Sequence, residues 1–268
     1  MTLERYDVPS FIDYLERNLD KATAMRTLLD MYRVTRTFPD LSNFRLGPNM
    51  FERIPLDWII MIEDGAAGAP SRLVAHGVTA RMPWSGEATA LPRGWQGAVR
   101  EVYQNTVGRR ATCNTLVGLF IKVEDDFRGS GWAAEMIRRM KATVARCGLS
   151  ALIIPLRLPR RYEKQYADIP FEEFAQLRRE DGEYLDHWLR LHVRLGARVI
   201  GSCDTSHQHA MHLDDLYQQV ECDRVEHTGY HLVQWNGEWY RAFVDVERRF
   251  ALIDQGCVWV QHPVEGSS

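Results

Sequence analysis

A short segment near the middle of the chain contains residue types that could hold a phosphate group. It comprises six consecutive residues: Arg128, Gly129, Ser130, Gly131, Trp132 and Ala133. Glycine has no Cβ, so phosphate oxygens can approach the backbone closely at two of these positions. Backbone N–H groups in the first turn of a helix have no helical partner, and the helix dipole adds partial positive charge there. A helix that begins here would therefore make a site suited to a pyrophosphate.

The residues on either side of this segment predict the strand and the helix that such a site requires. Leu116 to Val123 is apolar and rich in β-forming residues, which predicts a strand. Residues 124–126 form a short acidic turn. A helix is predicted over 131–147, because apolar side chains recur at helical spacing at Ala133, Met136, Ile137 and Met140. Ala151 to Pro155 predicts a second strand, which would lie parallel to the first in a βαβ unit.

The remaining patterns predict a mixed α/β chain with additions at both ends. Helices are expected at 8–36, 95–106, 171–179, 186–195 and, capped by Asp214 or Asp215, up to Val220. Strands are expected at 56–63, 72–82, 197–203, 208–213 and, as short pieces, between 230 and 261. We therefore predict an N-terminal helical extension over 1–50, a core over 51–213 and a C-terminal extension of short strands over 214–268.

Composition and charge argue against several classes of protein. Of 268 residues, 45% are hydrophobic and 26% are charged, as in ordinary soluble domains. The net charge of −3 gives no basic field for nucleic acid, and no apolar run approaches the length of a membrane span. The N-terminus does not resemble a signal peptide. The five cysteines are scattered and form no CxxC pair, which favours a reducing, cytoplasmic location without a zinc site.

The spacing of Arg128, Gly131 and Ala133, R-x-x-G-x-A, resembles the acetyl-CoA motif of the GCN5-related N-acetyltransferase (GNAT) superfamily. Longer stretches resemble one subgroup, which contains the GNAT-like loading domains of polyketide synthases and their stand-alone relatives. These stretches are LPRGWQ, LVGLFIKVEDDFRGSGWA, GLSALIIPLR, DGEYLDHWLRLHVRLGARVIG and VDVERRFALIDQGCVWVQHP. The resemblance implies a GNAT core with a mixed, mostly antiparallel sheet, a central splayed pair of parallel strands and flanking helices.

The resemblance also implies an activity and a co-substrate. We expect a CoA-dependent acyltransferase that uses acetyl-CoA or another acyl-CoA and moves the acyl group to an amine or a thiol by direct attack. Backbone groups of Ile121, Lys122 and Val123 would pair with pantetheine, and residues 128–133 would hold the pyrophosphate. A role in polyketide or other secondary metabolism follows from the same likeness. The acceptor and the oligomeric state are left open.

His192 is the residue to which the resemblance assigns the chemistry. Many GNAT enzymes carry a tyrosine four residues before the glycine that ends a helix. Here Gly196 corresponds to that glycine and His192 to the tyrosine. Histidine suits acid–base work near neutral pH, and its ring can donate a hydrogen bond to a thioester oxygen. The alternative is that the ring only packs on the helix beside Trp188 and Leu195.

The loop after the second parallel strand departs from the decarboxylating members of the subgroup. The resemblance leads us to expect a threonine there, yet no threonine lies between Ala151 and Asp204. Loss of one oxyanion donor costs about 3 kcal/mol in comparable sites, so malonyl decarboxylation with loading of a carrier protein is the alternative function. Arg157, Tyr162 and Tyr166 in this loop are expected to contact substrate. The arginine could pair with a CoA 3′-phosphate, an acidic helix of a carrier protein or a substrate carboxylate, and either tyrosine could supply a hydroxyl. A solvated basic loop is the competing interpretation.

Two further possibilities come from residue types alone. His207, His209 and His212 lie close in sequence, and the first two would share a strand face, but nearby ligands to complete a metal site are few. We therefore expect no metal. The second class of function is a catalytically silent protein that binds acyl-CoA or a carrier protein. We expect neither nucleic acid nor membrane as a partner.

Overall fold

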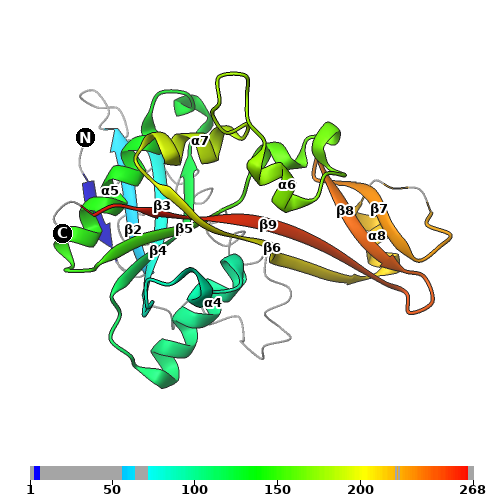
Figure 1. The fold of residues 1–268 in the computed structure, drawn as a ribbon, viewed down its shortest axis with the longest axis horizontal. Coiled ribbons are helices and arrows are strands. Elements are labelled where there is room, and N and C mark those ends of the chain that lie inside the picture. The colour runs from blue at the N-terminus through cyan, green and yellow to red at the C-terminus, as the bar shows by residue number, and fades with distance from the viewer. Residues whose placement is uncertain (1–2, 7–55, 64–71, 221, 223, 265–268) are drawn as a thin grey trace. The chain divides into compact units, whose positions relative to one another are not determined.

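The computed structural model describes residues 3–6, 56–63, 72–220, 222 and 224–264 (Figure 1). The chain forms two compact units. The first unit comprises Met1–Ala90, Val99–Ile154 and Gln261–Ser268, and the second comprises Leu91–Ala98 and Pro155–Val260. This division differs from the predicted boundaries near residues 50 and 213, which stay a prediction. Almost all of the predicted extension over 1–50, including its helix at 8–36, lies outside the described residues.

The sheet of the first unit is mixed, as predicted. It contains β1 (Leu3–Tyr6), β2 (Leu56–Glu63), β3 (Arg72–Met82), β4 (Thr115–Val123) and β5 (Ala151–Leu156), in that order. β1–β2, β2–β3 and β3–β4 are antiparallel, whereas β4–β5 is parallel. The last two residues of β5 belong to the second unit. Parallel strands need a crossover connection, and here a helix supplies it.

That crossover helix is α5, Trp132–Arg146, which packs against β3 and β4 (Figure 1). Its apolar residues recur at helical spacing, so one side of the helix faces the sheet. The predicted residues Met136, Ile137 and Met140 are fully buried, whereas Ala133 in the first turn is half-buried. Burying side chains of this size stabilises the fold by about 1.5–3 kcal/mol each. The helix is therefore firmly fixed to the strand that precedes it.

Four strands and three α-helices lie wholly or almost wholly among the described residues of the second unit. β6 (Arg198–His212) pairs with β9 (Phe250–His262), and β7 (Gly229–Trp235), β8 (Glu238–Asp245) and β9 form antiparallel neighbours. The helices are α6 (Phe171–Gln176), α7 (His187–Arg194) and α8 (Leu213–Gln219). Short 3-10 turns cover Pro159–Tyr162 and Lys164–Tyr166. The last two residues of β9 belong to the first unit.

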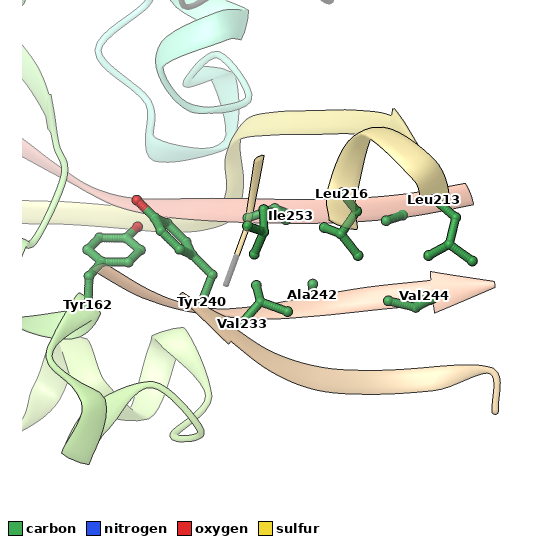
Figure 2. Packing of buried hydrophobic residues seen from close by; sticks show 10 residues of the cluster. Tyr162, Leu213, Leu216, Val233, Tyr240, Ala242, Val244 and Ile253 are labelled. Atoms are coloured by element: carbon green, nitrogen blue, oxygen red, sulfur yellow. The ribbon is translucent and has the colours of Figure 1, made fainter. Parts of the chain in front are cut away.

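The second unit has its own hydrophobic core, shown in Figure 2. Side chains from α8, β7, β8 and β9 meet between the strands and the helix. The cluster consists of Tyr162, Leu213, Leu216, Val220, Val233, Tyr240, Ala242, Val244, Ala251 and Ile253. Its apolar end is filled by aliphatic side chains, and the tyrosines Tyr162 and Tyr240 form the other end (Figure 2). Because tyrosine hydroxyl groups need hydrogen-bond partners when buried, polar residues are expected beside that end.

Several predicted elements need correction. Strands predicted at 197–203 and 208–213 are one strand, β6, and the short strands expected near the C-terminus are longer, with β9 alone covering Phe250–His262. β1 was not predicted. The helix predicted over 95–106 is α4, Gly94–Gln104, followed by a π-helical turn at Asn105–Arg109. His212 caps α8 through its side chain, so neither Asp214 nor Asp215 is the cap.

No helix within the described ranges has the length and apolar character to cross a membrane. All five cysteines lie in described segments, and none forms a disulfide there. Burial raises the pKa of the Cys257 thiol to about 12, so it carries little nucleophilic thiolate near neutral pH.

Gly94 is a position in the second unit at which any side chain should be strongly destabilising. Its φ is +60°, and a Cβ there would lie 2.2 Å from Cα of Ser206, a backbone atom that cannot easily move. We expect Gly94→Ala to lower the free energy of unfolding by at least about 3 kcal/mol, since positive-φ strain and overpacking add. Urea unfolding measures this.

The matched control is Gly182→Ala. Gly182 has a φ of +81°, and a Cβ added there would have no atom within 4 Å, so this variant tests strain without the clash. Gly182→Ala should lower the free energy of unfolding by about 1–2 kcal/mol. Equal losses in the two variants would contradict the packing argument for Gly94.

Candidate functional site

The predicted cradle has the expected strand, turn and helix. β4 ends at Val123, a 3-10 turn covers Asp125–Phe127, and α5 begins at Trp132. Gly129 and Gly131 have φ values of +77° and +85°, and a Cβ on either would meet no atom within 4 Å. The two positive φ values orient the backbone of the turn in a way that non-glycine residues adopt only with strain. Open space therefore lies beside both glycines, as close approach of a ligand to the backbone requires.

The N-terminus of α5 is not capped by a side chain. Gly131 is the N-cap residue, and it has no side chain with which to accept a hydrogen bond from the first turn. Arg128, Gly129, Ser130 and Gly131 are exposed, and Trp132 and Ala133 are half-buried. First-turn N–H groups without a helical or side-chain acceptor are available to an anion, and the dipole of this long helix favours one.

Negative charge next to the cradle is compensated by nearby cations. Carboxylates of the turn after β4 pair with Arg128, Arg72 and Lys122. The pairs are Asp125–Arg128 at 2.8 Å, Asp126–Arg72 at 2.8 Å and Glu124–Lys122 at 3.6 Å. The two exposed pairs, those of Asp125 and Asp126, contribute only about 0–1 kcal/mol each to stability, but they reduce repulsion of a phosphate. The pair with Asp125 engages only Nη2 of Arg128, so its other donors could still contact a ligand.

Glu135 in the first turn of α5 is compensated in the same way. It bonds to Arg138 at 2.9 Å and to Arg139 at 2.6 Å. Burial alone would raise the pKa of this carboxyl, but the hydrogen bonds from the two arginines outweigh burial and hold the pKa below its ordinary value. The first turn thus carries no unpaired carboxylate that would oppose an anion.

The last six residues of β4 lie beyond the point at which the two parallel strands cease to pair. The β4–β5 pairing covers only three positions, the last being Val117 with Ile153. An extra residue, Leu119, lies on β4 opposite the Val78–Thr79 step, and such bulges bend a strand. Ile121, Lys122 and Val123 beyond the bulge are half-buried, whereas the first five residues of β4 are buried. The predicted splayed pair is therefore present, and the residues predicted to pair with pantetheine are on its β4 side.

His192 lies on α7, near the end of the helix. Its side chain is 0% exposed, and its ring lies nearly perpendicular to that of Trp188 with 4.6 Å between centroids. The helix begins at Asp186, whose carboxylate accepts from the backbone of Trp188 and Leu189, and it ends before Gly196, which has a φ of +87°. The predicted helix and its terminal glycine are thus confirmed. The contact with Trp188 is the packing that the non-catalytic alternative predicts, and the catalytic role stays a prediction.

Arg157 lies in a cluster of polar residues in the second unit. Its Nε donates to Oε1 of Gln255 at 3.1 Å, and its Nη2 donates to Oε2 of Glu238 at 2.5 Å and to the hydroxyl of Tyr240 at 3.0 Å. The guanidinium carbon lies 3.9 Å from the ring centroid of Tyr162. The structure therefore brings two of the predicted substrate residues, Arg157 and Tyr162, together.

Tyr166, the third predicted substrate residue, has other contacts. Its ring packs against Phe174 at 5.3 Å, and Arg160 lies over its face at 5.5 Å. Its backbone oxygen accepts from Arg161 at 2.9 Å. These contacts fit loop packing, and none of them joins Tyr166 to the Arg157 cluster.

Sequence reasoning missed the acceptors that hold Arg157. Glu238, Tyr240 and Gln255 are 81 to 98 residues away in the chain, so no local spacing relates them to the arginine. One signal was available: Asn236-Gly237 between β7 and β8 is a strong hairpin turn. A hairpin at that turn puts Glu238 and Tyr240 on one face of β8, because strand side chains alternate.

The three histidines His207, His209 and His212 all lie on β6. No group of three or more His, Cys, Asp or Glu side chains within the described ranges is arranged to hold an ion. The rings of His207 and His209 lie 4.2 Å apart, as residues on one strand face should. The ring of His209 is also nearly perpendicular to that of Trp235, with 4.7 Å between centroids, and its Nε2 lies 3.4 Å from the amide nitrogen of Gln255. It is therefore a buried neighbour of the residues around Arg157.

The stability of the second unit should depend on pH through His209. Burial and, next, the charge of Arg157 lower the pKa of this histidine to about 4, against about 6.5 in an unfolded chain. The unfolded state takes up the proton first as pH falls, so stability is lost between about pH 6.5 and pH 4. His209→Gln should lack this loss, which is about 2 kcal/mol at pH 5 by the same relation.

Urea unfolding of both proteins at pH 7 and pH 5 measures this difference. His187→Gln, an exposed position on α7, is the control and should behave as the unmodified protein does. Identical pH dependence in the unmodified protein and His209→Gln would contradict the assignment.

Comparison with known proteins identifies the fold. No family model matches the chain. Among solved structures, the loading GNATL domain of CurA from Lyngbya majuscula has a TM-score of 0.50 and 13% identity, covering 98% of each chain. The GphF GNAT-like decarboxylase in complex with isobutyryl-CoA has a TM-score of 0.49 and 15% identity, covering 99% of this chain and 100% of that one.

Among curated proteins, the chain is similar to the arginine N-acetyltransferase avaD of Aspergillus versicolor. The two are 26% identical over 137 residues, which cover 48% of this chain and 47% of avaD. The match thus spans about half the length of that relative. The predicted resemblance to the GNAT superfamily and its loading domains is confirmed at the level of the fold: this chain has a GNAT-like α/β fold.

Proposed function

We propose that the chain is a CoA-dependent acyltransferase that uses acetyl-CoA or another acyl-CoA. The observation that carries this proposal is the turn at Gly129 and Gly131, which leads into the uncapped N-terminus of α5 directly after β4. The GNAT-like fold and the similarity to an arginine N-acetyltransferase support the same conclusion. A cytoplasmic role in polyketide or other secondary metabolism is part of the proposal.

Each part of the cofactor would meet a different part of the β4–α5 region. The N–H groups of residues 129–133 would donate to the pyrophosphate, as at other helix N-termini. Backbone groups of Ile121, Lys122 and Val123 would pair with the amides of pantetheine, which resembles a short strand. Arg128 would pair with a phosphate of CoA. Its exposed ion pair with Asp125 contributes little free energy, so it would not oppose this contact.

The reaction would proceed by direct attack. The lone pair of an amine or thiol acceptor attacks the thioester carbonyl, a tetrahedral oxyanion forms, and its collapse breaks the carbon–sulfur bond and releases CoA. One proton leaves the acceptor and one reaches the CoA sulfur, so a single group can carry both transfers. We assign that role to His192, because histidine is the side chain that most often acts as a general acid or base.

A second candidate is S-acyl transfer to a carrier protein, with or without loss of carbon dioxide from a malonyl group. The likeness to the loading domain of CurA favours it. Against decarboxylation, the loop has no threonine, and Leu158 near the corresponding place is a buried apolar residue. The hydroxyl of Tyr162 or Tyr166 is the substitute that the loop offers. A third possibility is a catalytically silent protein that binds acyl-CoA, and the test must distinguish it from the two enzymes.

The test mixes the protein with acetyl-CoA or malonyl-CoA and one acceptor at a time. L-arginine and holo acyl carrier protein are the two acceptors. Release of free CoA thiol and the intact mass of the acceptor are followed together. Acetylated arginine supports an N-acyltransferase, and an acylated carrier protein supports the loading function. Binding of CoA without thiol release in any mixture would overturn the enzyme proposal and leave a binding protein.

A further inference from the structure

The Arg157 cluster is a more rigid arrangement than an ordinary surface ion pair. The guanidinium is held by Gln255 on β9, by Glu238 and Tyr240 on β8, and by the face of Tyr162 beneath it. Tyr240 also donates to Glu238 at 2.5 Å. Three hydrogen bonds and a stacked ring leave the guanidinium plane a single orientation. Arginine held in this way loses little conformational entropy on binding a ligand.

Two hydrogen-bond donors of the cluster are not used by the protein. Within the described part of the chain, Nη1 of Arg157 has no acceptor, although Nε and Nη2 are both engaged. The hydroxyl of Tyr162 is fully buried and likewise has no partner among the described residues. Figure 2 shows the hydroxyl ends of Tyr162 and Tyr240 next to each other, and their rings lie 4.9 Å apart. A buried hydroxyl without an acceptor is costly unless a ligand completes it.

The charge of the cluster suits an anion. Glu238 faces one side of the guanidinium through Oε2, while the side chains of Arg157 and Glu238 are each 37% exposed. Burial would lower the pKa of Arg157, but Tyr162, Tyr240 and Glu238 outweigh it, so the guanidinium remains charged. Burial raises the pKa of Tyr162 to about 12, so its hydroxyl remains a donor near neutral pH. A permanent cation and a neutral donor are what a carboxylate requires.

We propose that Nη1 of Arg157 and the hydroxyl of Tyr162 bind a carboxylate carried by the substrate. This rests on the proposed acyltransferase function and names the substrate class: one of the two reactants carries a carboxylate. Two sources share that chemistry. The acceptor is an α-amino acid, or the acyl group is a dicarboxylic one such as malonyl. The cluster would distinguish such a molecule from its uncharged analogue, because an amide or methyl group leaves the cation without a partner.

The experiment measures direct binding by calorimetry and does not depend on turnover. One arm compares L-arginine with L-argininamide, and the other compares malonyl-CoA with acetyl-CoA. The carboxylate-bearing probe of one arm should bind at least about tenfold more tightly than its analogue, as expected for one charge-assisted pair. The arm that shows the preference identifies the source.

Three single variants and one double variant separate binding from packing. Arg157→Gln should abolish the preference, and Glu238→Gln should increase it several-fold, because the competing carboxylate is gone. Tyr162→Phe should reduce it about threefold or more without loss of thermal stability, since no protein hydrogen bond is removed. The double variant Arg157→Gln with Glu238→Gln controls for folding, as it leaves no unpaired charge.

Opposite effects of Arg157→Gln and Glu238→Gln support the site, and equal weakening by both would mean a purely structural ion pair. Absence of any preference in both arms overturns the proposal. Failure of the acyltransferase proposal gives a different result from failure of the carboxylate site. In that case acetyl-CoA itself would not bind, or would bind without being turned over.

Discussion

Replacing His192 by alanine is expected to lower kcat for acyl transfer at least about 100-fold, the usual contribution of a positioned acid–base group. The dissociation constant of acetyl-CoA should change less than about threefold, because the cradle over 128–133 does not include this residue. Steady-state kinetics with the best acceptor measures kcat, and calorimetry measures the dissociation constant.

Burial of the ring makes controls necessary. His192 is fully enclosed on α7 beside Trp188, so His192→Ala leaves a cavity and lowers stability whatever the role of the ring. His192→Gln fills most of that volume, retains a hydrogen-bonding end and cannot transfer a proton. His187→Ala, at an exposed position on the same helix, should be unchanged. If His192→Gln keeps kcat within a few-fold, the ring only packs and the catalytic assignment is wrong.

The second large effect is expected at the cradle. The double variant Gly129→Ala with Gly131→Ala should weaken acetyl-CoA binding about 100-fold or more. Each new Cβ would point into the open space beside the turn, where phosphate oxygens would have to approach. Two or more charge-assisted hydrogen bonds, each contributing about 1.5–3 kcal/mol, would be weakened together. Calorimetric titration with acetyl-CoA measures the change.

Backbone strain must be separated from the loss of the ligand contact. Gly86 and Gly148 in the first unit have φ values of +90° and +63°, and a Cβ on either meets nothing within 4 Å. The double variant Gly86→Ala with Gly148→Ala therefore suffers comparable strain, about 1–2 kcal/mol per position, away from the cradle. It should lose similar stability and keep its affinity. Equal loss of affinity in both double variants would argue against phosphate binding at residues 129–133.

The first unit was largely predictable from sequence because its determinants are local. β2, β3 and the end of β4 were found at their observed bounds, since each is an uninterrupted β-rich run. α5 was predicted within one residue at each end, because its apolar spacing begins after Gly131 and stops at Gly148. The parallel pairing followed from the helix between the strands. The position of the glycine turn could therefore be predicted from these local patterns.

The second unit was less predictable because its contacts join distant parts of the chain. β6 was predicted as two strands, since Asp204, Ser206 and the following histidines interrupt the apolar pattern. These polar residues are accommodated because partners come from elsewhere, as Trp95 does for Ser206 through its backbone N–H at 2.8 Å. Likewise, the loop sequence shows that Arg157 is basic but not which residues hold it. Pairings of this separation are not encoded in local spacing.

The most direct test of the central claim is hydrogen–deuterium exchange with and without acetyl-CoA. The N–H groups in the first turn of α5 lack helical acceptors, so they should exchange rapidly in the free protein. The account predicts that acetyl-CoA slows exchange in peptides covering 121–134, while peptides covering α8 are unchanged. Binding without protection at 121–134, or protection confined to another segment, would contradict the assignment of the cradle as the CoA site.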